Sequence, residues 1–211
     1  MKKIRGEKTI IEEIFEGESM HEYAVDANSD LTLLFIAASR KSSIIHVRVR
    51  LEKPGARAAI IGMIIGKGES RFAIHTLQEH TALNTTSDLL IKTVLSDSAA
   101  CMYDGGIRVE KYAQKTDAYQ RNENLLLSGR AHAESKPTLE ILANDVRCTH
   151  GATIGPISEE QLWYLATRGV AKKNAERLIV SGFLAAALEK VSDLSVRTSA
   201  ADRIATLVAQ S

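Results

Sequence analysis

Cysteine, proline and tryptophan are scarce in this chain of 211 residues, which contains two, three and one of them, respectively. Two cysteines cannot build the disulfide framework of a small secreted protein, and in a reducing compartment thiols bind metal or simply pack. An excess of charge is also absent, since 27 Lys and Arg residues face 26 Asp and Glu residues. No overall field therefore draws in nucleic acid or an acidic membrane, and neither is an expected partner.

Long apolar runs are missing as well. A membrane-spanning helix needs about 18 or more consecutive apolar residues, and no window of the sequence offers them. The N-terminal segment MKKIRGEKTIIEEIFEGE also lacks the apolar core of a signal peptide. We therefore expect a cytoplasmic protein without a membrane partner. Its length is enough for one domain, or for a domain with a small appendage.

The sequence does contain a period of two in its apolar residues, from about residue 22 to residue 143. Val47, Val49 and Leu51, for example, alternate with charged residues, as they do in a strand with one buried face. Glycine and proline interrupt these runs and predict turns. The expected turns are Pro54-Gly55, Gly66-Lys67-Gly68, Asp104-Gly105-Gly106, Ser128-Gly129 and Lys136-Pro137. Because no helical pattern separates the strands, a sandwich, a barrel and a solenoid all remain open.

After Pro156 the apolar period changes to that of a helix. Ser158 and Gln161 have the spacing of a capping box, and Gly169 predicts the end of this first helix. Three short helices bury little by themselves, so we expect them to pack against the β part of the chain. The other two expected helices run from about Ala171 to Lys190, and onward from Ser192 or Asp193.

A Cys-x-His pair is the main chemical feature of the sequence. If Cys148 and His150 lie on a strand, their side chains share one face and offer a thiolate and an imidazole, which suit iron or zinc. The alternative is a small buried thiol beside a hydrogen-bonded histidine. A closed metal site needs about four ligands, so further ligands must come from elsewhere in the fold, from a second subunit or from a bound cluster. A nucleophilic Cys/His dyad is less favoured, because no third residue orients it.

A phosphate-binding loop is excluded. Only three residues separate Gly62 from Gly66, where such a loop has four, and Gly68 replaces its Ser or Thr. We therefore expect no nucleotide to bind this chain. His75 and His80 fit neither the helical nor the same-face strand spacing of a metal site, and are expected to be structural or surface residues.

Several segments together resemble one known family. They are QKTDAYQ (114–120), NLLLS (124–128), KPTLEI (136–141), DVRCTHGAT (145–153), EEQL (159–162), Tyr164-Leu165 and Arg168-Gly169. In order and spacing they resemble the SufB/SufD scaffold family of iron-sulfur cluster assembly, from roughly residue 85 to residue 184. The Cys-x-His-Gly-Ala-Thr form resembles the SufD branch, since the SufB branch has a glutamate where Gly151 stands. The SufB branch also has an essential cysteine where this chain has Asn122.

The resemblance implies a fold and a function. The fold is mainly β, a right-handed parallel β-helix over residues 1–155 followed by a small C-terminal α-helical subdomain over residues 156–211. About the first 20 residues would be irregular or an edge strand, and the N-terminal helical region of full-length members would be missing. The function is that of a non-enzymatic scaffold, which pairs through its β-helix with itself or with a SufB-like paralogue and docks a SufC-type ABC ATPase.

The resemblance also implies where ligands and partners bind. Cys148 and His150 would be ligands of iron or of a transient iron-sulfur cluster. Asn122, Cys148 and His150 would lie at the dimer interface. The ATPase dock would consist of Gln161, Leu162, Tyr164, Leu165, Arg168 and Phe183. Because Asn122 replaces the SufB-branch cysteine, an alternative is a purely structural SufD-like partner of a cysteine-bearing SufB-like chain, which binds no cluster alone.

Overall fold

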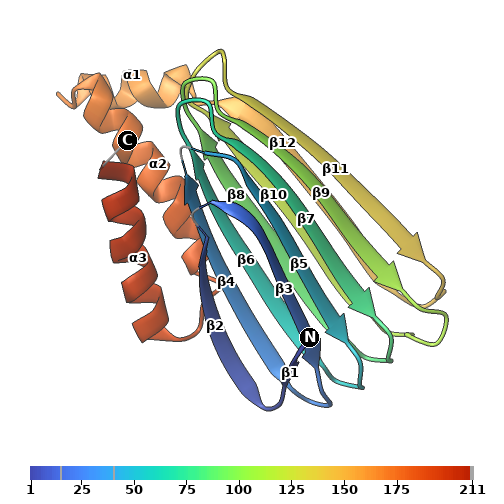
Figure 1. Cartoon of the computed structure of the whole chain (residues 1–211). Coiled ribbons are helices and arrows are strands. Elements are labelled where there is room, and N and C mark those ends of the chain that lie inside the picture. The colour runs from blue at the N-terminus through green and yellow to red at the C-terminus, as the bar shows by residue number, and fades with distance from the viewer. Residues whose placement is uncertain (15, 40, 210–211) are drawn as a thin grey trace.

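The computed structural model of the chain describes residues 1–14, 16–39 and 41–209, and Figure 1 shows the arrangement of its elements. The strands are β1 (Lys2–Ile4), β2 (Glu7–Ile14), β3 (Gly17–Val25), β4 (Asp30–Ser39), β5 (Ser43–Leu51), β6 (Arg57–Gly66), β7 (Arg71–His80), β8 (Thr86–Leu95), β9 (Ala100–Val109), β10 (Asp117–Leu126), β11 (His132–Ile141) and β12 (Arg147–Pro156). The helices are α1 (Glu159–Thr167), α2 (Lys172–Leu188) and α3 (Leu194–Ala209).

Two parallel sheets form the β part, and the chain passes from one to the other with every strand. Sheet A contains the odd-numbered strands in the order β1-β3-β5-β7-β9-β11, and sheet B contains the even-numbered strands in the order β2-β4-β6-β8-β10-β12. Each strand therefore lies beside the strand two positions later in the chain, one coil further along (Figure 1). This arrangement is a parallel β-solenoid followed by helices, as the resemblance implied.

The apolar residues with a period of two fill the space between the sheets. Val47, Val49 and Leu51 of β5 are buried there, while Arg48 and Arg50 face outward. Because side chains at i and i+2 of a strand share a face, each coil adds one apolar layer to the core. The inward residues of sheet B include Leu31, Leu33, Phe35, Ile60 and Leu89.

The interior becomes polar toward the last coils. Gln120, Asn122 and Asn124 of β10 are all buried. Gln120 Nε2 donates a hydrogen bond to the carbonyl oxygen of Gly105 at 3.2 Å, and Asn124 Nδ2 donates to Asn122 Oδ1 at 2.7 Å. These hydrogen bonds offset part of the cost of burying the amide groups.

Two of the expected turns were wrong. Asp104-Gly105-Gly106 belongs to β9, where a Cβ on Gly105 would lie 2.2 Å from the hydroxyl oxygen of Tyr103. The glycine makes room for a buried tyrosine rather than for a turn. Lys136-Pro137 lies within β11, which pairs only with β9 among the described strands. An edge strand tolerates proline, because one of its sides needs no N–H donor.

The first residues form β1 and β2, which are the edge strands of sheet A and sheet B. Charged side chains of these strands stand at inward positions. Lys8 is in register with the buried Leu31, and Glu12 is in register with the buried Phe35. Inward charges on an edge strand oppose pairing with a further strand, so this end of the solenoid is blocked.

The helices end the chain and pack on the outer face of sheet B (Figure 1). Ser158 Oγ accepts a hydrogen bond from the amide of Gln161, and the φ of +78° at Gly169 follows the end of α1, as expected. Asp193 Oδ1 accepts one from the amide of Val196 at the start of α3. The cluster shared by α2, α3 and sheet B includes Leu34, Ile61, Leu90, Val180, Leu184 and Ile204. No helix in the described ranges is long and apolar enough to span a membrane.

Candidate functional site

Cys148 and His150 lie on β12, the last strand of sheet B. Strand β12 pairs with β10, and Cys148 is in register with Ala118 while His150 is in register with Gln120. Both of these β10 residues are buried between the sheets. The Cys-x-His pair therefore lies on the inner side of the terminal coil, and both side chains share one face of the strand, as the sequence predicts.

The two side chains have different surroundings. Cys148 is half-buried and packs against a small apolar cluster, whereas His150 is exposed. Burial raises the pKa of the Cys148 thiol, and the negative charge of the nearby Asp117 raises it further. In the isolated chain the thiol is therefore favoured over the thiolate, so a metal must displace the proton to bind. The cluster around Cys148 consists of Ile107, Val109, Ala113, Ala118 and Ala143.

The chain by itself does not complete a metal site at this position. Within the described ranges, no group of three or more His, Cys, Asp or Glu side chains gathers around one point that could hold a metal ion. Cys148 and His150 supply two ligands, and a closed tetrahedral site needs about four. A metal bound here would need further ligands from a second molecule or from a cluster that carries its own sulfide.

At the end of the solenoid that carries Cys148, the inward positions of β11 and β12 hold no Lys, Arg, Asp or Glu. Ile141 at the end of β11 is 37% exposed, and Ile154 of β12 is 46% exposed. Other inward positions of β11 and β12 hold small or apolar residues, such as Leu139 on β11 and Ala152 on β12. This end therefore contrasts with the opposite one, where Lys8 and Glu12 occupy inward positions. An open apolar core end is suited to contact with another molecule.

Asn122, which the resemblance predicts at the dimer interface, is buried inside the solenoid. It stands between Ile91 of β8 and Ala152 of β12, and only 1% of its surface is exposed. Its Nδ2 atom is buried without a hydrogen-bond partner, while its Oδ1 accepts from Asn124. A molecule that contacts the end of the solenoid would meet β11 and β12 before it reached Asn122.

Helix α1 carries four of the six residues predicted to dock a partner, Arg168 directly follows it, and none of the side chains of the helix is buried. Tyr164 is 54% exposed, and the Arg168 guanidinium lies 5.4 Å from the centre of its ring. Trp163, which was not among the predicted docking residues, is 69% exposed beside it. The other predicted residues of this helix, Gln161, Leu162 and Leu165, are exposed or half-buried.

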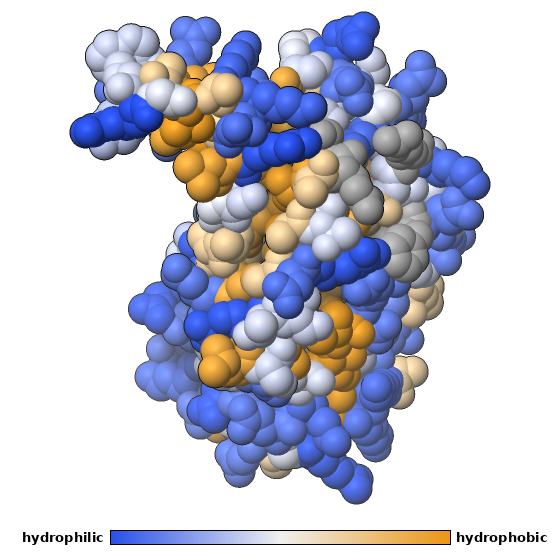
Figure 2. All heavy atoms as spheres, turned by 90° about the vertical axis from the view of Figure 1, so that its left-hand side faces the viewer, coloured by the Kyte–Doolittle hydropathy of each residue, from blue (hydrophilic) through white to orange (hydrophobic). Residues whose placement is uncertain are grey.

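A shallow hollow of about 440 Å³ lies between α1 and α2. Its lining includes Trp163, Tyr164 and Leu165 from α1 and Ile179 from α2. Figure 2 shows the molecule from the side of the helices. Apolar side chains lie among polar ones near the top of the molecule, at the height of α1 in Figure 1. The only tryptophan of the chain, on a helix without buried residues, was the sequence signal that could have identified this surface.

Phe183 is separate from the other predicted docking residues. It is half-buried and packs against the cluster that joins the helices to sheet B. The Lys92 ammonium lies 4.2 Å from the centre of its ring, and Lys92 Nζ lies 2.7 Å from Glu123 Oε2. Phe183 therefore stabilises the attachment of α2 to the solenoid, and α1 provides the exposed surface.

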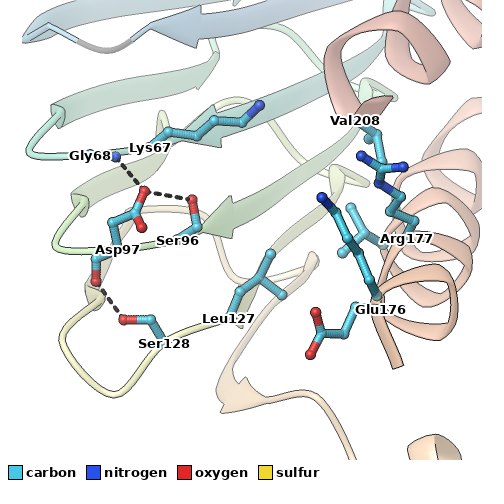
Figure 3. Close-up of a pocket in the computed structure, with 11 residues that line it drawn as sticks. Lys67, Gly68, Ser96, Asp97, Leu127, Ser128, Glu176, Arg177 and Val208 are labelled. Carbon is cyan, nitrogen blue, oxygen red and sulfur yellow. Dashed lines mark hydrogen bonds between the residues drawn. The ribbon is translucent and has the colours of Figure 1, made fainter. Parts of the chain in front are cut away.

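A cavity of about 500 Å³ lies away from this surface, between solenoid loops and α2 (Figure 3). Ser96, Asp97 and Ser128 line it on the loop side, where Gly68 N–H donates to Asp97 Oδ2. Lys67 donates to the carbonyl oxygen of Leu207, and Arg177 donates to that of Ala209. These cations stabilise the C-terminal end of α3, where carbonyl groups lack partners within the helix.

Comparison with known proteins finds one matching family model, described as "SUF system FeS cluster assembly, SufBD core domain", over residues 18–183. The iron-sulfur cluster assembly protein SufD of Escherichia coli K12 is 39% identical over 129 residues, which are 61% of this chain and 30% of that protein. Protein ABCI7, chloroplastic, of Arabidopsis thaliana is 30% identical over 182 residues, which are 85% of this chain and 38% of that protein.

The iron-sulfur cluster assembly protein SufD of Bacillus subtilis 168 is 35% identical over 123 residues, which are 58% of this chain and 28% of that protein. The aligned part is therefore about a third of the length of these curated relatives. Helix α3 lies outside the region that the family model matches, whereas β12 and α1 lie inside it.

Proposed function

Because the chain belongs to the SufBD core family of the SUF system, we propose that it is a non-enzymatic scaffold subunit of iron-sulfur cluster assembly in the cytoplasm. It receives iron or a transient cluster at Cys148 and His150 and pairs through the open end of its solenoid. A SufC-type ATPase docks on α1. Nucleotide chemistry belongs to that ATPase, because this chain lacks a phosphate-binding loop.

The contrast between the two ends of the solenoid carries this proposal. One end places Lys8 and Glu12 at inward positions, and the other leaves Ile141 and Ile154 exposed beside the Cys-x-His strand. Exposed apolar core residues favour association, whereas inward charges oppose it. A second copy, or a SufB-like paralogue, that covers the open end would also cover the candidate ligands.

Pairing supplies the ligands that a single chain lacks. Two copies related by a twofold axis would bring two Cys148 thiols and two His150 imidazoles to one interface, since an isologous contact uses the same patch twice. Four ligands of this kind are suited to iron or to a cluster. Association also excludes water, and a bound metal replaces the proton that the half-buried Cys148 otherwise keeps.

Anaerobic reconstitution with ferrous iron and sulfide tests this function. We expect a visible charge-transfer absorption in the wild-type protein and its loss in the double variant Cys148→Ala, His150→Ala. Cys101→Ala is the matched control and should keep the absorption, because Cys101 is buried in the core and burial raises the pKa of its thiol to about 12. An undiminished absorption in the double variant would disprove the assignment of the ligands.

The docking surface has its own test, since Trp163 is the only tryptophan and is 69% exposed. Addition of a SufC-type ATPase should shift the Trp163 fluorescence to shorter wavelength, because the indole ring leaves water on binding. Tyr164→Ala should weaken the binding by about tenfold or more, as expected for an aromatic anchor. Tyr112→Ala, at an exposed tyrosine on a solenoid loop, is the control. Equal effects of the two substitutions would contradict the assignment of α1.

The buried Asn122 supports a second candidate function. In this alternative the chain is a structural SufD-like partner that binds no cluster alone and completes a complex with a cysteine-bearing SufB-like chain. A pull-down with the tagged protein distinguishes the two functions. The structural partner would capture the paralogue and the ATPase and would show no absorption after reconstitution by itself, whereas the scaffold would show it without the paralogue.

A further inference from the structure

Sheet A has an outer face that the helices leave uncovered, because they pack on sheet B (Figure 1). One row of residues on this face carries metal-ligand chemistry. Met20 of β3 is in register with His46 of β5, and His46 is in register with His75 of β7. The neighbouring residues Ile45 and Ile74 are buried in the core, so the row faces outward.

The two histidines are already adjacent. Their ring centroids are 4.8 Å apart, and the ring planes differ by 13°. This distance equals the spacing of about 4.8 Å between neighbouring strands, so the sheet register itself holds the rings together. Met20 occupies the next position of the same row and is 67% exposed. Its flexible thioether has room to lean over the neighbouring His46.

Two carboxylates lie beside this row. Glu18 Oε1 lies 3.6 Å from His46 Nε2, and Asp104 of β9 is in register with His75. Carboxylates at both ends of the histidine pair lower the electrostatic cost of a cation between them. A thioether and two imidazoles form a soft ligand set, which selects Cu(I) over hard divalent ions. The described ranges contain no group of three or more His, Cys, Asp or Glu side chains that could hold a metal ion. The third ligand of this row is therefore the Met20 thioether, and its softness favours a soft ion.

We propose that Met20, His46 and His75 form a surface site for a soft monovalent metal ion, Cu(I) in particular. Neutral imidazole and thioether bind such an ion without releasing a proton. Binding requires rotations of side chains that are all at least partly exposed, and the strands stay in place. The proposal is independent of the proposed function, since this row lies on sheet A and the Cys-x-His pair lies on β12 of sheet B.

Anaerobic titration of the full chain with Cu(I), in competition with a chromophoric chelator, tests this site. The Cys148→Ala variant is the starting protein, because a half-buried thiol also attracts Cu(I). We expect one equivalent to bind, His46→Gln with His75→Gln to abolish the binding, and Met20→Leu to weaken it by about tenfold or more. Met102→Leu is the matched control, because Met102 is exposed on the same face in a row without histidine.

X-ray absorption of the loaded protein provides the second measurement. Sulfur and nitrogen ligands should both appear around the copper, and the sulfur ligand should be lost in Met20→Leu. Circular dichroism confirms that each variant keeps its fold. Undiminished binding in the double histidine variant, binding that Met102→Leu removes as strongly as Met20→Leu, or a copper shell without sulfur would overturn the proposal.

Discussion

His80 shows at the scale of a single residue how the solenoid holds a titratable group in its interior. Its ring is fully buried, with Nδ1 2.8 Å from Thr85 Oγ1 and Nε2 2.9 Å from Ser87 Oγ. Thr85 Oγ1 lies 3.1 Å from Thr116 Oγ1, which continues the network into the next coil. Burial lowers the pKa of His80 from 6.5 to about 4. The residue is structural, which is one of the two roles expected from the sequence.

The depressed pKa of His80 predicts a loss of stability in acid. Between pH 6.5 and pH 4 the unfolded chain binds a proton at this histidine and the folded chain does not, so the free energy of unfolding falls as the pH falls. The loss from this group amounts to about 2 kcal/mol at pH 5, and above pH 6.5 the group has no effect. Urea unfolding of the wild type and of His80→Gln at pH 7.5 and pH 5 measures it.

His132→Gln provides the control, because His132 is exposed. The stability of His80→Gln should depend on pH less steeply than that of the wild type, and the stability of His132→Gln should follow the wild type. Equal slopes for the wild type and His80→Gln would show that His80 is not held neutral by the fold.

At the scale of elements, α2 is attached to sheet B through an apolar interface that contains an ion pair between a buried lysine and a half-buried glutamate. Lys92 Nζ lies 2.7 Å from Glu123 Oε2 and 4.2 Å from the centre of the Phe183 ring. The side chain of Lys92 is only 8% exposed. A buried cation that loses its partner is costly, whereas removal of both charges costs much less.

Glu123→Gln should therefore lower the free energy of unfolding by about 3 kcal/mol, and the double variant Lys92→Met, Glu123→Gln should recover most of that loss. Chemical denaturation of the single and double variants measures the difference. Lys41→Met, which removes a largely exposed partner of Glu16, should leave the unfolding midpoint unchanged. A double variant that is less stable than Glu123→Gln would mean that the ion pair itself stabilises the attachment of α2.

Elements were predictable from sequence where one local signal determined them. The cap at Ser158 and the glycine at 169 defined α1, and alternation defined β5. The wrong predictions share a different cause. Gly105 lies in a strand because Tyr103 needs the space, and Pro137 lies in a strand because β11 is at an edge. The first reason depends on how the buried Tyr103 ring packs in the core, and the second depends on which strands lie beside β11. The local sequence pattern contains neither of these facts.

At the scale of the whole molecule, the two ends of the solenoid differ in charge, and this difference predicts the oligomeric state. The end at β11 and β12 is apolar and open, so the chain should pair there. Ile154→Glu places a charge on this end at a side chain that is 46% exposed, and it should convert a dimeric preparation to monomer. Light scattering coupled to size-exclusion chromatography measures the change.

Ile11→Glu is the control on the opposite edge strand, where Ile11 is 40% exposed on the outer face of sheet B. It should leave the dimer intact. If Ile11→Glu loses the dimer and Ile154→Glu keeps it, the dimer contact lies at the β1 and β2 end of the solenoid, and the prediction is wrong. The free energy of unfolding of both variants, measured at the same protein concentration, separates dissociation from misfolding.

The sequence alone predicted the alternating strands, the helix ends and the family, because alternation, caps and motifs are local properties of the chain. Only the tertiary structure decided which coil positions meet. The register between coils buries Asn122, leaves Cys148 and His150 at an open end, and aligns Met20, His46 and His75 from three separate strands. That register depends on the length and shape of every intervening loop, so residues more than 25 positions apart become neighbours only when the solenoid has formed.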